Sequence, residues 1–297
     1  MITRGEFIKT LIQPFFAMTA INTLSAFKNF TDHLPHQNFL MPVLFVGHGS
    51  PMNGIEDNEF SKRWTSLAKE IPVPKAVLVI SAHWFTKGTS ITAMDFPQTI
   101  HDFGGFPDSL YQIQYPAPGN PALAKETVSM IHSTHVELNH DWGLDHGTWT
   151  IIRHMYPDAN IPVLQLSIDY SKGPEFHYNL GKELIGLRSK GVLIIGSGNM
   201  IHNLRMVDWN KLDGPAYGYD WALQMNQTFK DLILKKDHQP LINYNQLGKE
   251  ALLAIPTPEH YLPLLYTLAL QDKNENISFF NDKPVGGSLT MTSVKIG

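Results

Sequence analysis

The sequence predicts a single α/β domain in which helices flank a mostly parallel central sheet. Short apolar runs rich in β-branched residues have the length of strands that are buried on both faces. Segments whose apolar residues recur at helical spacing separate these runs. The sequence shows no internal repeat and no boundary to a second domain. Strands that alternate with helices along a chain form parallel sheets covered by helices. We therefore expect one folded domain over residues 41–297.

Residues 1–40 differ from the rest and are expected to form an N-terminal extension. Arg4 and Lys9 precede an apolar run at residues 11–21 that is too short to span a membrane. A basic start before an apolar run is the outline of an export signal. The pattern resembles a twin-arginine signal, except that Gly5 stands in place of the second arginine. We expect a cytoplasmic protein, with export as the alternative.

The strands are predicted from apolar runs that stop at glycine or polar residues. The last of them is an alternating segment rather than an apolar run. Between the second and third strands, residues 95–119 are rich in glycine and proline, and a long loop of this kind is usually functional. The predicted strands occupy residues 42–46, 76–80, 161–168, 191–195 and 288–296.

The helices are predicted from the spacing of apolar residues and from their end signals. Pro72 and Pro74 close the first helix. Asn120 and Thr257 are expected N-caps, because each precedes a proline at the first helical position. The predicted helices occupy residues 58–71, 121–131, 175–189, 217–234 and 257–270, and a further helical run ends at residue 156.

Composition narrows the classes of partner. Charged residues make up 17% of the chain and the net charge is −4, which gives no reason to expect nucleic acid or a membrane surface as a partner. There is no cysteine, so a transition metal can be held only by His, Asp or Glu, and the 14 histidines offer many ligands. The sequence leaves the oligomeric state open.

Four histidines occupy positions that a parallel sheet would bring together. His48, His83 and His202 follow predicted strands, and His260 lies in the first turn of a predicted helix. The carboxyl ends of parallel strands meet at one edge of a sheet. Neutral imidazole is a preferred ligand for zinc, copper, iron and nickel, and the adjacent Glu259 offers a carboxylate. The sequence therefore predicts a metal site at the carboxyl ends of the strands.

Five motifs stand out along the chain: GHGSPMN at residues 47–53, SAHW at 81–84, HDFGGFP at 101–107, DHGTW at 145–149 and PEHYLP at 258–263. In this order they resemble the class III extradiol ring-cleavage dioxygenases, and within them the 4,5-DOPA dioxygenase extradiol group. The resemblance extends from about residue 41 to the C-terminus. It implies one α/β domain, one bound divalent metal, and oxygen-dependent opening of a catechol ring such as that of DOPA to a muconic semialdehyde.

The resemblance also implies roles for individual residues. His48 and His83 match the first two metal ligands of the family, and His202 and His260 match the other two histidines assigned to the metal. His146 matches a histidine on the substrate side. We expect His146 and His202 to perform acid–base work, since imidazole titrates near neutral pH. His202 is expected to reach the metal when no substrate is present.

The third ligand and the metal stay open at this stage. The wider class binds iron(II) through two histidines and one carboxylate, so either Glu259 or His260 can complete the shell. We expect Fe(II) for catalysis. Zn(II) is a plausible bound metal, because members of this group are often described as zinc proteins, but zinc performs no redox chemistry. Phe103, Phe106 and Trp149 are candidates for contact with the substrate ring, and core packing explains each of them equally well.

Two other functions fit the same residues. A zinc-dependent hydrolase would use the histidines to activate water, with Glu259 as the base, and would need no oxygen. A binding or scaffolding protein would keep the fold without catalysis, although a scaffold has no need of the four histidines. Oxygen uptake with catechols separates these functions.

Overall fold

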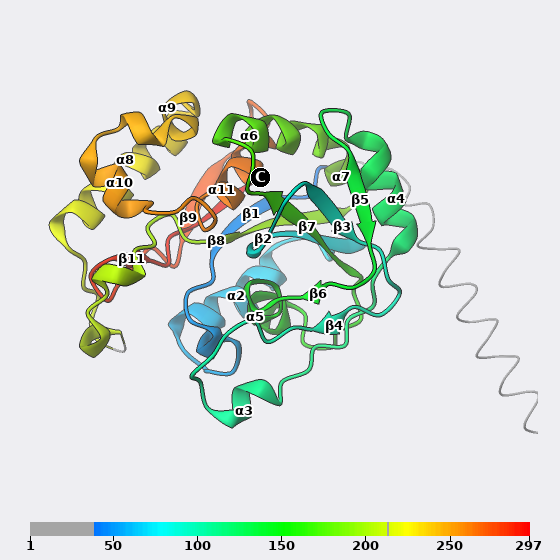
Figure 1. The fold of residues 1–297 in the computed structure, drawn as a ribbon, viewed down its shortest axis with the longest axis horizontal. Helices are drawn as coiled ribbons and strands as arrows, with labels where there is room; N and C mark the ends of the chain where they lie inside the picture. The colour runs from blue at the N-terminus through cyan, green and yellow to red at the C-terminus, as the bar shows by residue number, and fades with distance from the viewer. Residues whose placement is uncertain (1–38, 213) are drawn as a thin grey trace, which may run out of the picture.

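The computed structural model describes residues 39–212 and 214–297 (Figure 1). The apolar segment that resembles an export signal lies within residues 1–38, outside the described residues, so the expected cytoplasmic location and its alternative, export, stay predictions. Among the residues described, no helix is both long enough and apolar enough to cross a membrane.

The core of the structure is an eight-stranded sheet. Its four central strands are parallel and lie in the order β7-β2-β8-β1. Two strands extend the β1 edge with antiparallel pairing, and on the other edge β3 is antiparallel to β7 and parallel to β5. The strands, in sheet order, are β5 (Val136–Asn139), β3 (Thr89–Thr92), β7 (Val163–Asp169), β2 (Ala76–Thr86), β8 (Val192–Gly198), β1 (Val43–Gly47), β12 (Ser293–Ile296) and β9 (Ile277–Phe280).

Helices cover both faces of this sheet, as Figure 1 shows. Helices α2 (Glu59–Glu70) and α5 (His146–Met155) pack on one face, and α11 (Leu262–Ala269) packs on the other. The remaining α-helices in the described residues are α3 (Asp108–Tyr111), α4 (Pro121–Met130), α6 (Pro174–Glu183), α7 (Ile185–Ser189), α8 (Asp220–Leu234), α9 (Gln239–Ile242) and α10 (Lys249–Ala254).

The predicted two-sided burial of the central strands is confirmed. In β1, Val43 and Phe45 belong to the core on the α11 side, whereas Leu44 and Val46 belong to the core on the α2 and α5 side. Full burial of such a side chain stabilises the folded state by about 1.5–3 kcal/mol. The apolar runs therefore form a sheet that is the middle of three layers, with helices on either side.

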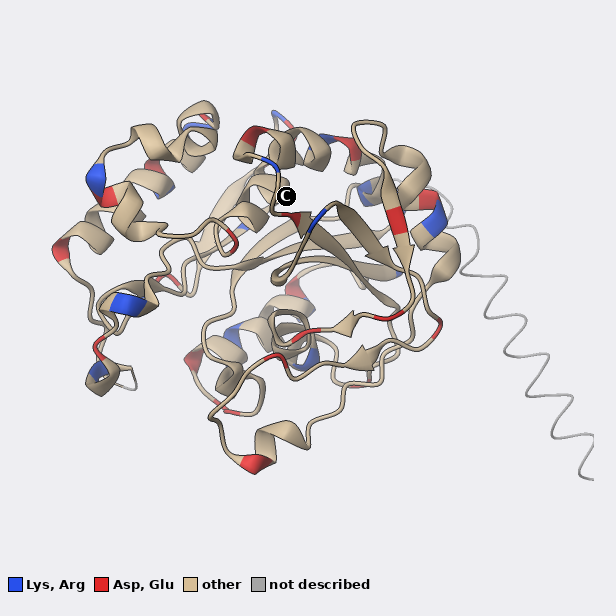
Figure 2. Ribbon diagram, viewed as in Figure 1, with Lys and Arg blue, Asp and Glu red and all other residues tan. Residues whose placement is uncertain are grey.

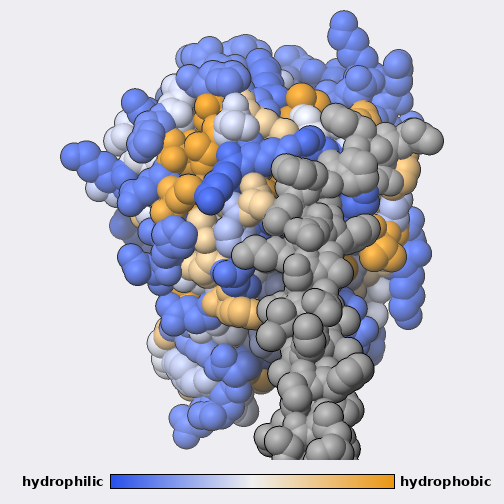
Figure 3. Space-filling model, turned by 90° about the vertical axis from the view of Figure 1, so that its right-hand side faces the viewer, coloured by the Kyte–Doolittle hydropathy of each residue, from blue (hydrophilic) through white to orange (hydrophobic). Residues whose placement is uncertain are grey.

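Charged residues lie mainly on the outer helices and loops, where acidic and basic residues are interspersed along the chain (Figure 2). The face seen in Figure 3 is mostly hydrophilic, with scattered hydrophobic areas.

The structure corrects several predicted boundaries near the site. Strand β2 continues to Thr86, so His83 lies within the strand rather than after it. The pairing of β2 with β7 is irregular between Ile80 and Phe85, and such irregularities re-aim side chains near active sites. The predicted helix over 175–189 is divided at Leu184 into α6 and α7.

The end of the chain also differs from the prediction. The helix expected from Thr257 begins only at Leu262, so His260 lies in the preceding turn. The carbonyl oxygen of His260 accepts a hydrogen bond from the Asn199 backbone at 2.9 Å, which ties this turn to the end of β8. The predicted strand over 288–296 is two strands, β12 and the short β11 (Leu289–Thr290), which pairs with β10 (Pro284–Val285).

Candidate metal centre

His48 directly follows β1 and is almost fully buried. Its Nδ1 lies 2.9 Å from Ser197 Oγ on β8. The Ser197 hydroxyl has one hydrogen to donate, and it forms a hydrogen bond to the carbonyl oxygen of Gly147 at 2.5 Å. Ser197 Oγ must therefore accept a hydrogen bond from the Nδ1–H group of His48, which leaves Nε2 of His48 with a free lone pair.

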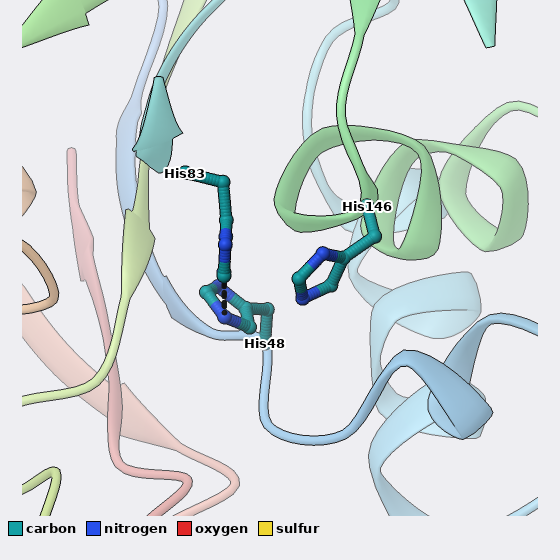
Figure 4. A group of neighbouring side chains, drawn as sticks. All are labelled: His48, His83 and His146. Atoms are coloured by element: carbon teal, nitrogen blue, oxygen red, sulfur yellow. Dashed lines mark hydrogen bonds between the residues drawn. The ribbon is translucent and has the colours of Figure 1, made fainter. Parts of the chain in front are cut away.

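His83 faces His48 from the irregular part of β2. Its Nδ1 lies 3.2 Å from Oδ2 of Asp102, and its Nε2 lies 3.1 Å from Nε2 of His48 (Figure 4). An ionised carboxylate only accepts hydrogen bonds, so Nδ1 of His83 carries the proton. Two unprotonated Nε2 atoms then face each other, an arrangement that a cation between them would stabilise. Two histidine nitrogens at about 2.1 Å from one metal, on adjacent positions, lie about 3 Å apart, so this pair fits a metal.

His146 is the first residue of α5, whose N-cap is Asp145. Its Nδ1 lies 3.0 Å from the same Asp102 oxygen. The potential ligand atoms of His48, His83 and His146 all lie within 4.8 Å of one another. Figure 4 shows the three imidazoles, which come from three separate elements, gathered in one place.

His202 and His260 form a second group with Glu259, again with ligand atoms within 4.8 Å. The rings of His202 and His260 are stacked, with centroids 3.5 Å apart and planes 8° from parallel. The ring of His260 lies 5.4 Å from that of His48 and 5.1 Å from that of His83. His260 therefore stands between the two groups, with His202 beyond it.

The geometry favours His260 over Glu259 as the residue that faces the other histidines. Oε1 of Glu259 accepts a hydrogen bond from the Thr257 hydroxyl at 2.8 Å and lies 3.3 Å from Nδ1 of His260. This contact leaves Nε2 of His260 free, as the contacts of Ser197 and Asp102 do for His48 and His83. A carboxylate that orients a metal-binding histidine in this way is a common arrangement.

Their environment favours the neutral form of His48, His202 and His260, which is the form that binds metal. Burial, and then the neighbouring His83, lower the pKa of His48 well below its usual value. Burial, followed by His202, does the same to the pKa of His260. Burial lowers the pKa of His202 to about 4, although the charge of Glu259 opposes the shift.

In His146 and in Asp102, burial and hydrogen bonding shift the pKa in opposite directions. Burial and then His83 lower the pKa of His146, and its hydrogen bond to Asp102 partly offsets them. Burial raises the pKa of Asp102, but hydrogen bonds from His146 and His83 outweigh burial and hold that pKa well below its usual range. Asp102 is therefore an anion at neutral pH.

Asp102 lies within the motif HDFGGFP, but no sequence pattern marks it as a site residue. Ser197 and Asp145 were likewise not predicted. Asp145 is fully buried and accepts hydrogen bonds from Ser81 Oγ at 2.7 Å and Gln165 Nε2 at 2.6 Å, so it joins α5 to β2 and β7. A polar residue between glycines after a buried strand was the available signal for Ser197.

The three aromatic candidates differ in position. Phe103 is partly buried, and its ring meets that of His146 edge-on with centroids 5.5 Å apart. The ring of Phe106 meets that of Phe103 edge-on, with centroids 5.3 Å apart. Trp149 is fully buried and donates from Nε1 to the Ile100 carbonyl at 2.9 Å, so it belongs to the core.

The fold and the site together define a class of protein, an α/β enzyme fold with one histidine-rich site suited to a metal at the carboxyl ends of its parallel strands. Residues 34–287 match the family described as the catalytic LigB subunit of aromatic ring-opening dioxygenase.

Individual proteins similar to this chain agree with the family match. The chain is 48% identical over 262 residues to the 4,5-DOPA dioxygenase extradiol of Escherichia coli K12, with 86% of this chain and 95% of the relative covered. It is 35% identical over 259 residues to the 4,5-DOPA dioxygenase extradiol of Beta vulgaris, with 85% and 95% covered. The crystal structure of an uncharacterized Escherichia coli K12 protein matches with a TM-score of 0.75 and 43% identity, over 86% of this chain and 100% of that one. The chain belongs to the LigB family and is a class III extradiol dioxygenase.

Proposed function

We propose that this enzyme opens the ring of a catechol such as 3,4-dihydroxyphenylalanine beside its two hydroxyl groups, with both atoms of O₂ incorporated, to give a muconic semialdehyde. The observation that carries the proposal is the 3.1 Å approach of the Nε2 atoms of His48 and His83, since a bound cation accounts for it. Two relatives named for DOPA cleavage support the choice of substrate.

The residues that would hold one divalent metal are His48, His83 and His260, with His202 as the fourth. When bound, iron(II) would bring the catechol and O₂ together and supply the redox chemistry that zinc lacks. Fe(II) is therefore the proposed catalytic metal, and Zn(II) the plausible inactive occupant.

Proton transfer falls to His146 and His202 in this proposal. Nδ1 of His146 is engaged by Asp102 at 3.0 Å, so Nε2 is left to accept the proton of a catechol hydroxyl. His202 stacks beside His260 and would return a proton to the opened product. Phe103, whose ring meets His146 edge-on, supplies an aromatic surface for the substrate ring.

The hydrolase alternative has less support. It requires Glu259 as a free base, whereas one oxygen of Glu259 already contacts both Thr257 and His260. The family match also favours ring cleavage.

The test is oxygen uptake by protein loaded anaerobically with Fe(II) and then mixed with aerated buffer and a panel of catechols that includes DOPA. We expect O₂ consumption with DOPA, a yellow product, and two ¹⁸O atoms in that product when ¹⁸O₂ is used. The zinc-loaded protein serves as the matched control and should consume no O₂. A sample that contains one iron per chain yet consumes no O₂ with any catechol would overturn the proposal.

A further inference from the structure

We propose that Asp102 is a positioning residue that fixes the proton arrangement of His83 and His146 together, with Nδ1 protonated and Nε2 free in both rings. The inference rests on the proposed function, because it assigns His83 to the metal and His146 to the substrate proton. It adds a residue on which both of these tasks depend.

The contacts of one carboxylate carry the inference. Oδ2 of Asp102 lies 3.0 Å from Nδ1 of His146 and 3.2 Å from Nδ1 of His83. Oδ1 accepts a hydrogen bond from the backbone N–H of His146 at 2.9 Å. An ionised carboxylate has acceptor sites only, so both imidazoles must donate to it. The shared oxygen also keeps the two rings together, with centroids 3.8 Å apart.

Backbone pairing just before Asp102 anchors its loop independently of the Asp102 side chain. The strand β4 (Gln98–Thr99) precedes Asp102 and pairs in parallel with β6 (Gly143–Leu144), which leads into His146. The Ile100 N–H donates to the Leu144 carbonyl at 2.8 Å. The loop that carries Asp102 and the helix start that carries His146 are therefore anchored to each other, and the carboxylate is only 16% exposed.

The same geometry predicts what an amide would do. In Asp102→Asn, the side chain keeps its size but has one oxygen acceptor and one NH₂ donor in place of two acceptors. If the oxygen stays with the His146 backbone, the NH₂ faces the Nδ1 protons of both rings. At least one imidazole must then move its proton to Nε2 or turn away, and either change removes the lone pair that the site needs.

The experiment compares Asp102→Asn and Asp102→Glu with Asp108→Asn, which alters an exposed carboxylate later in the same segment. Histidine tautomers are read from long-range ¹H–¹⁵N spectra of zinc-loaded protein labelled at histidine, and zinc affinity is measured by competition with a chelator. Fe(II)-loaded protein supplies kcat and KM. Circular dichroism shows whether each variant is folded.

We expect Asp102→Asn to lose about 10- to 100-fold in zinc affinity or in kcat, with a new Nε2-protonated histidine signal and a smaller change in KM. Asp102→Glu should recover part of the loss, and Asp108→Asn should resemble the wild type. Asp102→Asn with wild-type tautomers, zinc affinity and kcat would overturn the inference. If Asp102→Asn is unfolded, the test rests on Asp102→Glu. Wild-type histidine tautomers in Asp102→Glu, together with weaker zinc binding or a lower kcat, support the inference. An altered tautomer without any loss of zinc affinity or kcat overturns it.

The tautomer and zinc measurements need no turnover, so the two proposals fail separately. A wild-type protein with the expected tautomers but no O₂ uptake contradicts the proposed function alone. Full O₂ uptake by Asp102→Asn, with unchanged zinc affinity, contradicts the role of Asp102 alone.

Discussion

The imidazole of His202 lies flat against that of His260, with ring centroids 3.5 Å apart and planes 8° from parallel. The lone pair of an imidazole nitrogen lies in the plane of its ring. Two parallel rings at this separation therefore cannot both direct a lone pair at the same point. His260, which lies nearer to His48 and His83, is the better placed of the two to face a metal, and His202 would have to turn its ring to join it.

His48→Ala and His83→Ala are each expected to lose most of the bound metal while the fold persists. Each substitution removes one of the two Nε2 atoms that face each other at 3.1 Å. Elemental analysis of zinc-loaded protein measures the effect, and His135→Ala, which removes an exposed histidine, is the control. Near-stoichiometric zinc in either site variant would exclude that residue as a ligand.

His146→Ala and His202→Ala should keep most of the metal and lose turnover. Acid–base catalysis contributes about 10²- to 10⁴-fold, so we expect kcat of the Fe(II)-loaded variants to fall by at least about 100-fold. The potential ligand atom of His146 lies within 4.8 Å of those of His48 and His83. The metal content of His146→Ala is therefore a more decisive test than that of His202→Ala. Loss of metal from His146→Ala would move that histidine into the metal shell.

Glu259→Gln should affect metal content less than His260→Ala. The glutamate contacts Nδ1 of His260 at 3.3 Å, so its loss weakens the orientation of the ring but leaves the ring in place. We expect Glu259→Gln to lose about tenfold in zinc affinity, and His260→Ala to lose most of the bound zinc. The opposite order would identify Glu259 as the ligand.

Gly198→Ala should disturb the turn that carries His260. A Cβ at Gly198 would overlap the carbonyl oxygen of His260, which is backbone and cannot rotate away. We expect the free energy of unfolding to fall by about 1–3 kcal/mol, together with zinc affinity. Gly104→Ala meets open space and is the matched control in urea unfolding. Equal stability of the two variants would show that the turn has room to shift.

His177 should make the protein less stable in acid. Burial lowers its pKa to about 4, whereas an unfolded histidine titrates near 6.5. The unfolded chain therefore binds more protons between these values, so the contribution of His177 is complete above about pH 6.5 and is lost as the pH falls toward 4. The full difference amounts to at most about 3.5 kcal/mol.

Urea unfolding of metal-free protein at pH 5 and pH 7 measures this effect. His177→Gln should lose less stability between pH 7 and pH 5 than the wild type, and His135→Gln should behave like the wild type. A wild-type pH dependence in His177→Gln would show that His177 does not hold its neutral form in the native state.

The sequence alone determined the layers of the fold. Runs such as Val43–Gly47 are apolar at every position of the strand, and only burial on both faces of a sheet accommodates them. Because parallel strands end at one edge, the positions of His48 and His83 near such strands were enough to predict a shared site. The motifs around them were enough to indicate the family, which the comparisons confirm.

Tertiary structure decided what surrounds those histidines. Pro258 and Pro263 are equally good signals for a helix start, but in the folded chain the helix begins at Leu262. The carbonyl oxygen of His260 instead accepts a hydrogen bond from the Asn199 backbone, a contact that no local sequence pattern predicts. Asp102 lies in a loop without periodicity, so its pairing with His83 and His146 could not be read from spacing. A side chain's residue type sets which hydrogen bonds it can form, but its partners are set by segments far apart in sequence that only the folded chain brings into contact.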